Sequence, residues 1–284
     1  MSGNIGIVTD STCDIPPETA AELGIVVVPA YVNIGEESYL DGVELSRQEF
    51  YEQLPSYARP PTTAAPPPGA FASAYEQLAD RGDDEILSIH IASSLSGMLN
   101  AARLGAQDAA RVQVTLYDSQ QLTMGLGLLA ILAAKEAAAG CTMDEIVATL
   151  DERVKRTYIL GVLDTLEYLR RSGRVNWAQF GIGTLLRIKP LVYVHMGQVE
   201  MPEKVRTSKR ALTRMLELAL ALGPLEDLAL LHTHGSDEEI RAFREKTAFL
   251  NPEGPSPLAV ELTPAIGAHL GPGGLGIACI TTGP

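Results

Sequence analysis

The 284-residue sequence contains few cysteines, few aromatic side chains and fewer basic than acidic residues. Its three cysteines, Cys13, Cys141 and Cys279, lie far apart, a spacing typical neither of a disulfide framework nor of a zinc site. We interpret them as small buried side chains in a protein of a reducing compartment. Aromatic residues make up only 5%, which indicates an aliphatic interior suited to an apolar ligand or to an ordinary core.

Positive charge is also scarce, because 22 Lys and Arg stand against 35 Asp and Glu, for a net charge of −13. Nucleic-acid affinity rests mainly on neutralising phosphates, so this balance argues against a nucleic-acid partner. The first apolar run, residues 3–9, is only as long as a strand and lacks the basic flank and cleavage site of a signal peptide. We therefore expect a cytoplasmic protein without stable membrane insertion.

Familiar nucleotide and hydrolase motifs are missing or incomplete. The sequence has no P-loop and no G-x-S-x-G nucleophile elbow. Residues 125–130 match G-x-G-x-x-A, but they do not directly follow a strand, as a dinucleotide fingerprint must. We interpret Gly125 and Gly127 as sites of close packing near a helix start, and we expect no cofactor.

The first half alternates short apolar runs with amphipathic stretches, which predicts parallel strands joined by helices. The expected strands are residues 5–8, 25–29, 86–91 and 112–117. Capping boxes predict helix starts, because each hydroxyl can accept an N–H that the helix leaves unpaired. They pair Ser46 with Glu49, Thr142 with Glu145 and Ser236 with Glu239.

The second half has more strands and shorter connections, which predicts an antiparallel sheet covered by helices, one of them over residues 208–222. The expected strands are residues 158–163, 189–195, 198–205, 228–232, 259–262 and 276–281. We predict a two-domain α/β protein. Residues 1–156 should form an N-terminal α/β/α domain with a mainly parallel sheet, and residues 157–284 should form a C-terminal α/β domain with a mainly antiparallel sheet. The ligand is expected to lie between the two domains. The proline-rich residues 60–68 should form a stiff loop that presents Thr62 and Thr63.

One strand ends in a cluster of hydroxyls. Residues 86–91 are followed by Ser93, Ser94 and Ser96, and ligands of open α/β sheets bind beyond the carboxyl ends of strands. These serines could attack a substrate, hold a carboxylate or phosphate, or cap a helix. A nucleophile would need a base, for which the sequence offers five histidines: His90, His195, His232, His234 and His269.

The histidines and arginines allow further alternatives. His232 and His234 share one face of an expected strand, but two-residue spacing without a third ligand is weak support for metal. His269 lies among five glycines in residues 267–276, where it could donate to a carboxylate or be satisfied locally. Residues 170–214 hold ten basic against two acidic residues, a net +8 that leaves −21 for the rest, and form either a docking surface or a solvated face.

Eight motifs, taken together and in their order, resemble the DegV family. They are IVTDSTCDIP (7–16), TAAPPPGAF (63–71), IASSLSG (91–97), YDSQQLTMGLG (117–127), DTLEYLRRSGR (164–174), LLRIKPLV (185–192), EKVRT (203–207) and GAHLGPGGLG (267–276). That family comprises bacterial fatty-acid-binding proteins that serve as the B subunit of fatty acid kinase. The sequence departs from the family pattern at Ala64, Pro67, Ala70, Ala92 and Met98.

The resemblance implies a carrier that encloses one long-chain fatty acid, such as palmitate, stearate or oleate, and is not itself an enzyme. By motif, Thr63, Ser93 and His269 match the family's carboxylate-binding residues, with Thr62 as the alternative to Thr63. The resemblance places Arg170 behind them as a cation that does not itself touch the carboxylate. Arg174 and Arg206 match positions for docking the ATP-binding kinase subunit, which forms an acyl phosphate for phospholipid synthesis. The competing hypothesis is a serine-dependent hydrolase or transferase that uses Ser93 or Ser96 with His269.

Overall fold

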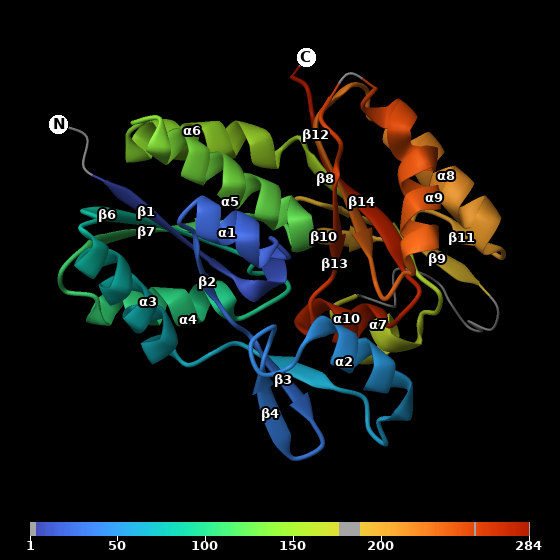
Figure 1. Ribbon diagram of the computed structural model, residues 1–284, viewed down its shortest axis with the longest axis horizontal. Helices are drawn as coiled ribbons and strands as arrows, with labels where there is room; N and C mark the ends of the chain where they lie inside the picture. Colours follow the sequence, from blue (N-terminus) through green and yellow to red (C-terminus); the bar gives the residue numbers. More distant parts are fainter. Residues whose placement is uncertain (1–3, 176–187, 253, 284) are drawn as a thin grey trace.

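The computed structural model describes residues 4–175, 188–252 and 254–283. Two β-sheets lie side by side, with helices between and outside them, and a small third sheet lies below both (Figure 1). The sequence-based prediction of an α/β fold is confirmed.

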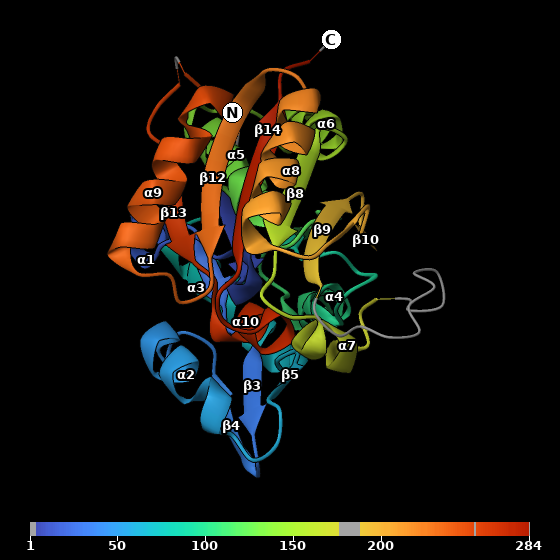
Figure 2. The same ribbon diagram turned by 90° about the vertical axis from the view of Figure 1, so that its right-hand side faces the viewer.

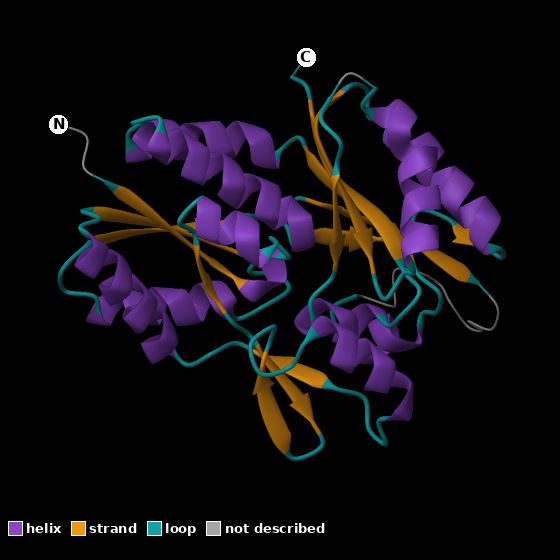
Figure 3. Ribbon diagram, viewed as in Figure 1, coloured by secondary structure: helices purple, strands orange, loops and turns teal. Residues whose placement is uncertain are grey.

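The first sheet has four parallel strands in the spatial order β2-β1-β6-β7, as predicted. The strands are β1 (Ile5–Asp10), β2 (Val26–Val28), β6 (Glu85–His90) and β7 (Gln113–Asp118). Helices cover both faces (Figure 3). On one side lie α1 (Pro17–Glu22), α5 (Thr123–Ala138) and α6 (Met143–Val154), and on the other α3 (Pro68–Arg81) and α4 (Met98–Asp108).

The second sheet has the order β10-β9-β8-β14-β12-β13, and β11 pairs with β9. All its pairings are antiparallel except that of β12 with β13. The strands are β8 (Thr157–Val162), β9 (Lys189–His195), β10 (Gln198–Glu200), β11 (Lys204–Val205), β12 (Leu225–His232), β13 (Leu258–Glu261) and β14 (Leu275–Thr281). The outer face carries α8 (Ser208–Ala221) and α9 (Asp237–Thr247), as Figure 2 shows. The single strand expected over residues 198–205 is therefore wrong, since two short strands pair separately with β9.

The third sheet was not foreseen. It joins β3 (Tyr31–Ile34) to β4 (Glu37–Leu40) on one side and to β5 (Thr62–Ala64) on the other, all antiparallel. The expectation of a loop at Thr62 and Thr63 is wrong, because Thr63 pairs with Val32. The neighbouring prolines do not prevent this, since β5 is an edge strand and they lie outside its three residues. Beside this sheet lie α2 (Arg47–Gln53), α7 (Glu167–Ser172) and α10 (Pro264–Leu270).

Local sequence signals account for several elements. All three predicted capping boxes form, at the starts of α2, α6 and α9. Close packing at Gly127 is also confirmed, because a Cβ there would lie 2.5 Å from the carbonyl oxygen of Cys13. This glycine therefore lets α5 approach the turn at Ser11–Cys13, directly after β1.

The hydrophobic core continues from the first sheet through α5 to the inner face of the second sheet. Ile7, Leu126 and Ile159 belong to this one cluster. Because side chains alternate between the two faces along β8, Leu160 lies on the other face, in a separate hydrophobic cluster under α8. Because one core includes side chains from both halves, the boundary at residue 156 stays a prediction.

Candidate ligand-binding site

A cavity of about 720 Å³ is lined by both halves of the chain. This volume lies within the usual range for small-molecule sites. Its apolar lining includes Ile159, Val192, Val194, Leu231, Leu262 and Ile266. The inner face of the second sheet thus supplies much of the apolar wall, and polar side chains are contributed by β5, α10 and the loops after β6 and α7.

Two residues far apart in the sequence meet at this cavity. Oγ1 of Thr63 on β5 lies 2.9 Å from Nε2 of His269 on α10, and both residues line the cavity. Burial, and then the positive charge of Arg174, lower the pKa of His269 from 6.5 to about 4. The imidazole is therefore neutral near pH 7, with one nitrogen donating and the other accepting. A hydroxyl and a neutral imidazole together offer hydrogen bonds to a ligand without bringing a buried charge.

Ser93 lines the same cavity but has a different partner. Its hydroxyl donates to Oδ2 of Asp118 at 2.5 Å, and its backbone N–H lies 3.3 Å from each oxygen of that carboxylate. Asp118 ends β7, so the contact joins the loops after two neighbouring parallel strands. The side chain that reaches His269 is Thr63, while Ser93 is turned towards Asp118.

The other two serines differ from each other. Ser96 accepts the N–H of Met98 at 3.3 Å, in the first turn of α4, as expected for a residue that shapes the helix start. Ser94 instead donates to the carbonyl oxygen of Gly197 at 2.8 Å, in the turn between β9 and β10. The helix-cap alternative is therefore wrong for Ser94, because its hydroxyl links the two halves of the chain.

The three arginines singled out from the sequence occupy different places. Arg174 follows α7, lines the cavity and donates to the carbonyl oxygen of Ser172 at 2.6 Å. Arg170, on α7, is exposed and is not among the described residues that line the cavity. Arg206 is exposed between β11 and α8. Of the three, Arg174 is the cation whose charge acts on His269.

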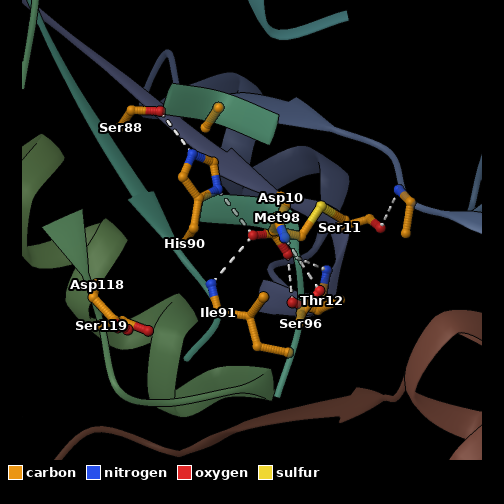
Figure 4. A network of polar contacts seen from close by, with 12 residues as sticks. Asp10, Ser11, Thr12, Ser88, His90, Ile91, Ser96, Met98, Asp118 and Ser119 are labelled. Carbon is orange, nitrogen blue, oxygen red and sulfur yellow. Dashed lines mark hydrogen bonds and ion pairs between the residues drawn. The ribbon is translucent and has the colours of Figure 1, made fainter. Parts of the chain in front are cut away.

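A buried polar network at the end of β1 was missed by the sequence analysis (Figure 4). Oδ2 of Asp10 lies 2.9 Å from Nδ1 of His90 and accepts the N–H of Ile91 at 3.2 Å. Nε2 of His90 in turn lies 2.7 Å from Oγ of Ser88. Asp10 therefore fixes the end of β6, the strand that leads to Ser93.

A second set of buried carboxylates holds the first turn of α10. Asp14 accepts the N–H of Thr263 at 2.7 Å, and Asp41 accepts the N–H of Ala265 at 3.1 Å. Ser11 donates to Asp41 at 2.6 Å. Burial raises the pKa of Asp14 from 3.8 to about 7, although the charge of Arg47 opposes the shift. These contacts anchor the helix that carries His269, and only knowledge of partners more than two hundred residues away could have revealed them.

The geometry does not favour the serine-enzyme hypothesis. In the described residues, His269 contacts Thr63 and Ser93 contacts Asp118, so no serine–histidine pair is seen at the cavity. Ser88, His90 and Asp10 are linked by hydrogen bonds in the same way as the serine, histidine and aspartate of a catalytic triad. All three side chains are, however, fully buried. A substrate could not reach that serine.

The two histidines considered as metal ligands do not lie as expected. β12 ends at His232, and His234 has a φ of +59°, so the expected placement of both imidazoles on one strand face is wrong. Within residues 4–175, 188–252 and 254–283, no group of three or more His, Cys, Asp or Glu is arranged to hold a metal ion. No helix in the same ranges is long and apolar enough to cross a membrane.

Fold and cavity together define an α/β protein built around one large, mainly apolar cavity with a hydroxyl–imidazole pair in its wall. A family model described as "Uncharacterised protein, DegV family" matches residues 4–282. The chain belongs to the DegV family. It is 38% identical over 280 residues to a DegV domain-containing protein of Streptomyces coelicolor, covering 98% of each chain.

Solved structures agree with this assignment. A DegV family protein from Thermus thermophilus, described by its fatty acid binding, superposes with a TM-score of 0.88 at 32% identity, covering 98% of this chain and 100% of the other. DegV from Bacillus subtilis, described as a fatty acid binding protein, gives a TM-score of 0.86 at 32% identity, covering 99% and 100%. The resemblance inferred from the motifs is thus confirmed.

Proposed function

We propose that this protein binds one long-chain fatty acid in the cavity and presents its carboxylate to a separate ATP-dependent kinase subunit. The observation that carries the proposal is the Thr63–His269 pair in the wall of a mainly apolar cavity of about 720 Å³. The two solved relatives described as fatty-acid-binding support it, since each is 32% identical over nearly the whole chain.

A buried carboxylate is unfavourable unless several donors hydrogen-bond to it. Thr63 and His269 carry one donor hydrogen each; the bond between them uses one, and both can serve a carboxylate that replaces this bond. The guanidinium of Arg174 supplies a nearby positive charge. Ser93 joins them when its hydroxyl rotates away from its partner Asp118. Arg170, exposed on the neighbouring helix α7, acts from farther away.

Acyl-phosphate formation belongs, in this proposal, to the partner kinase, and this chain contributes no catalytic residue. The exposed Arg174 and Arg206 form part of the docking surface, with Arg174 also lining the cavity. The protein then works in the cytoplasm, where ATP is available, and its product enters phospholipid synthesis.

Binding is tested by native mass spectrometry of the purified protein, organic extraction of its ligand, and titration of delipidated protein with palmitate and oleate. We expect a single bound fatty acid, and loss of binding when Ser93→Ala and His269→Ala are combined. His234→Ala is the matched control, because His234 is exposed, outside the cavity lining and paired with Glu261. Recovery of no fatty acid, together with no binding of either added acid, overturns the proposal.

Presentation is tested by adding ATP and a kinase subunit from the same cell, and trapping acyl phosphate with hydroxylamine. We expect Arg206→Glu to abolish the trapped product and to leave palmitate affinity unchanged. Arg103→Glu, which alters an exposed arginine on α4, serves as the charge-matched control. Full acyl-phosphate formation by the Arg206→Glu variant would remove this residue from the docking surface.

A further inference from the structure

Gly161 is only half-buried in a place where a strand residue is normally covered. It lies on β8, between β9 and β14, and its neighbours Leu160 and Val162 are buried. Gly161 itself is only half-buried and lines the cavity. Because strands protect both edges of β8, this exposure comes from the cavity over the face of the sheet.

The fold does not require glycine at this position. The φ of Gly161 is outside the left-handed region, and a Cβ built on it would have its nearest neighbour, the carbonyl oxygen of Leu275, at an ordinary 3.7 Å. Glycine inside a strand lowers stability and often marks the close approach of a ligand. A half-buried glycine that packing does not explain therefore indicates space kept for a ligand.

The residue opposite is also glycine, but for a different reason. Gly276 on β14 pairs directly with Gly161, and a Cβ there would lie 2.8 Å from the carbonyl oxygen of Leu160. The same row of the sheet continues to Val192 on β9 and Leu231 on β12. All four residues line the cavity, so two bare backbones form a dimple between two branched side chains.

Along β8 the dimple is bounded as well. Ile159 lies two residues before Gly161, so alternation places it on the same face, and it too lines the cavity. A side chain at position 161 would therefore project into the cavity rather than into the core under α8.

We propose that Gly161 is a ligand-contacting residue, at which the methylene chain of the ligand packs against bare backbone. This inference rests on the proposed function, since it assigns the path of the bound acyl chain. A methyl group at position 161 fills space that the chain occupies, and a valine side chain fills more.

The test is the dissociation constant for palmitate of delipidated wild-type protein and of the Gly161→Ala and Gly161→Val variants. Because the added side chain overpacks the cavity, Gly161→Ala should raise the dissociation constant about tenfold, and Gly161→Val should raise it further. Gly69→Ala is the control, because a Cβ at Gly69 meets no atom within 4 Å and Gly69 does not line the cavity. Its affinity should stay at the wild-type value, and Gly161→Ala should unfold at no lower temperature than wild type.

A second variant reports contact independently of affinity. The thiol introduced by Gly161→Cys should react with a small maleimide in delipidated protein and be protected by palmitate, with peptide mass spectrometry locating the label. Cys141, which is partly exposed and outside the cavity lining, provides the internal reference rate.

The outcomes separate this inference from the function on which it rests. Wild-type protein that yields no fatty acid on extraction and binds neither palmitate nor oleate overturns both. Two results overturn only the role of Gly161. One is a folded Gly161→Val variant whose dissociation constant for palmitate lies within about twofold of the wild-type value. The other is a thiol at position 161 that palmitate does not protect from the maleimide.

Discussion

Replacing Asp14 with asparagine should change how the stability of the protein depends on pH. Asp14 is 1% exposed, accepts the N–H of Thr263 at 2.7 Å, and has a second carboxylate oxygen without a partner among the described residues. Burial raises the pKa of this carboxyl from 3.8 to about 7. The folded protein thus holds this proton more tightly than the unfolded chain does.

The sign follows from linkage. A carboxyl whose pKa is raised by folding contributes stability below its unfolded pKa of 3.8 and loses that contribution as the pH rises through about 7. A shift of about three units, at about 1.36 kcal/mol each, corresponds to about 4 kcal/mol. The Asp14→Asn variant cannot ionise there, so its free energy of unfolding relative to wild type should rise by about this amount between about pH 4 and pH 8.

Urea unfolding followed by circular dichroism, across that pH range, measures this difference. The asparagine amide would be buried where the second oxygen has no partner, which costs about 1–3 kcal/mol at every pH and moves the curve without changing its slope. Asp14→Ala is the control, because it also cannot ionise and should show the same slope with a larger constant loss. A difference between Asp14→Asn and wild type that stays constant across the range refutes the reasoning.

Further predictions concern the cavity and its supports. Thr63→Val should raise the dissociation constant for palmitate by about ten- to a hundredfold, as expected for losing a hydrogen bond to a charged group, whereas Thr62→Val, at an exposed neighbour, should not; calorimetric titration compares them. The pKa of His269, read by NMR, should lie near 4 without ligand and rise when palmitate binds, because an adjacent carboxylate favours the imidazolium; no rise would place the carboxylate elsewhere. Gly127→Ala should lower the free energy of unfolding by about 1–3 kcal/mol, since its Cβ would lie 2.5 Å from the carbonyl oxygen of Cys13, and thermal unfolding beside Gly69→Ala checks this.

Local signals in the sequence predicted much of the fold. The capping boxes at Ser46, Thr142 and Ser236 mark true helix starts because a capping box needs only residues three positions apart. The central strands β1 and β6 of the first sheet were found because their apolar runs are buried on both faces. The third sheet was missed because β5 holds three residues between prolines, and its partner β3 lies some thirty residues earlier.

The candidate site was predictable only in part. Thr63 and His269 were selected by motif, and their contact at 2.9 Å depends on the packing of β5 beside α10, which no spacing in the sequence reports. The bond from Ser93 to Asp118 was missed because it joins the ends of two strands through side-chain orientation. The roles of Arg170, Arg174 and Arg206 stay predictions, since a docking surface is defined by the partner it meets.

The segment Asp10–Asp14 explains why so many ionisable groups are buried away from the cavity wall. Asp10 accepts the N–H of Ile91 at the end of β6, just before Ser93, and Asp14 accepts the N–H of Thr263 at the start of α10, the helix of His269. Both bonds involve carboxylates that are almost fully buried, where removing one partner is costly and the geometry is therefore tightly fixed. Five consecutive residues thus set the position of the Ser93 loop relative to His269, although the two belong to opposite halves of the chain. A buried carboxyl group at each end of this segment is the physical reason that the two parts of the site are held in place on either side of the cavity.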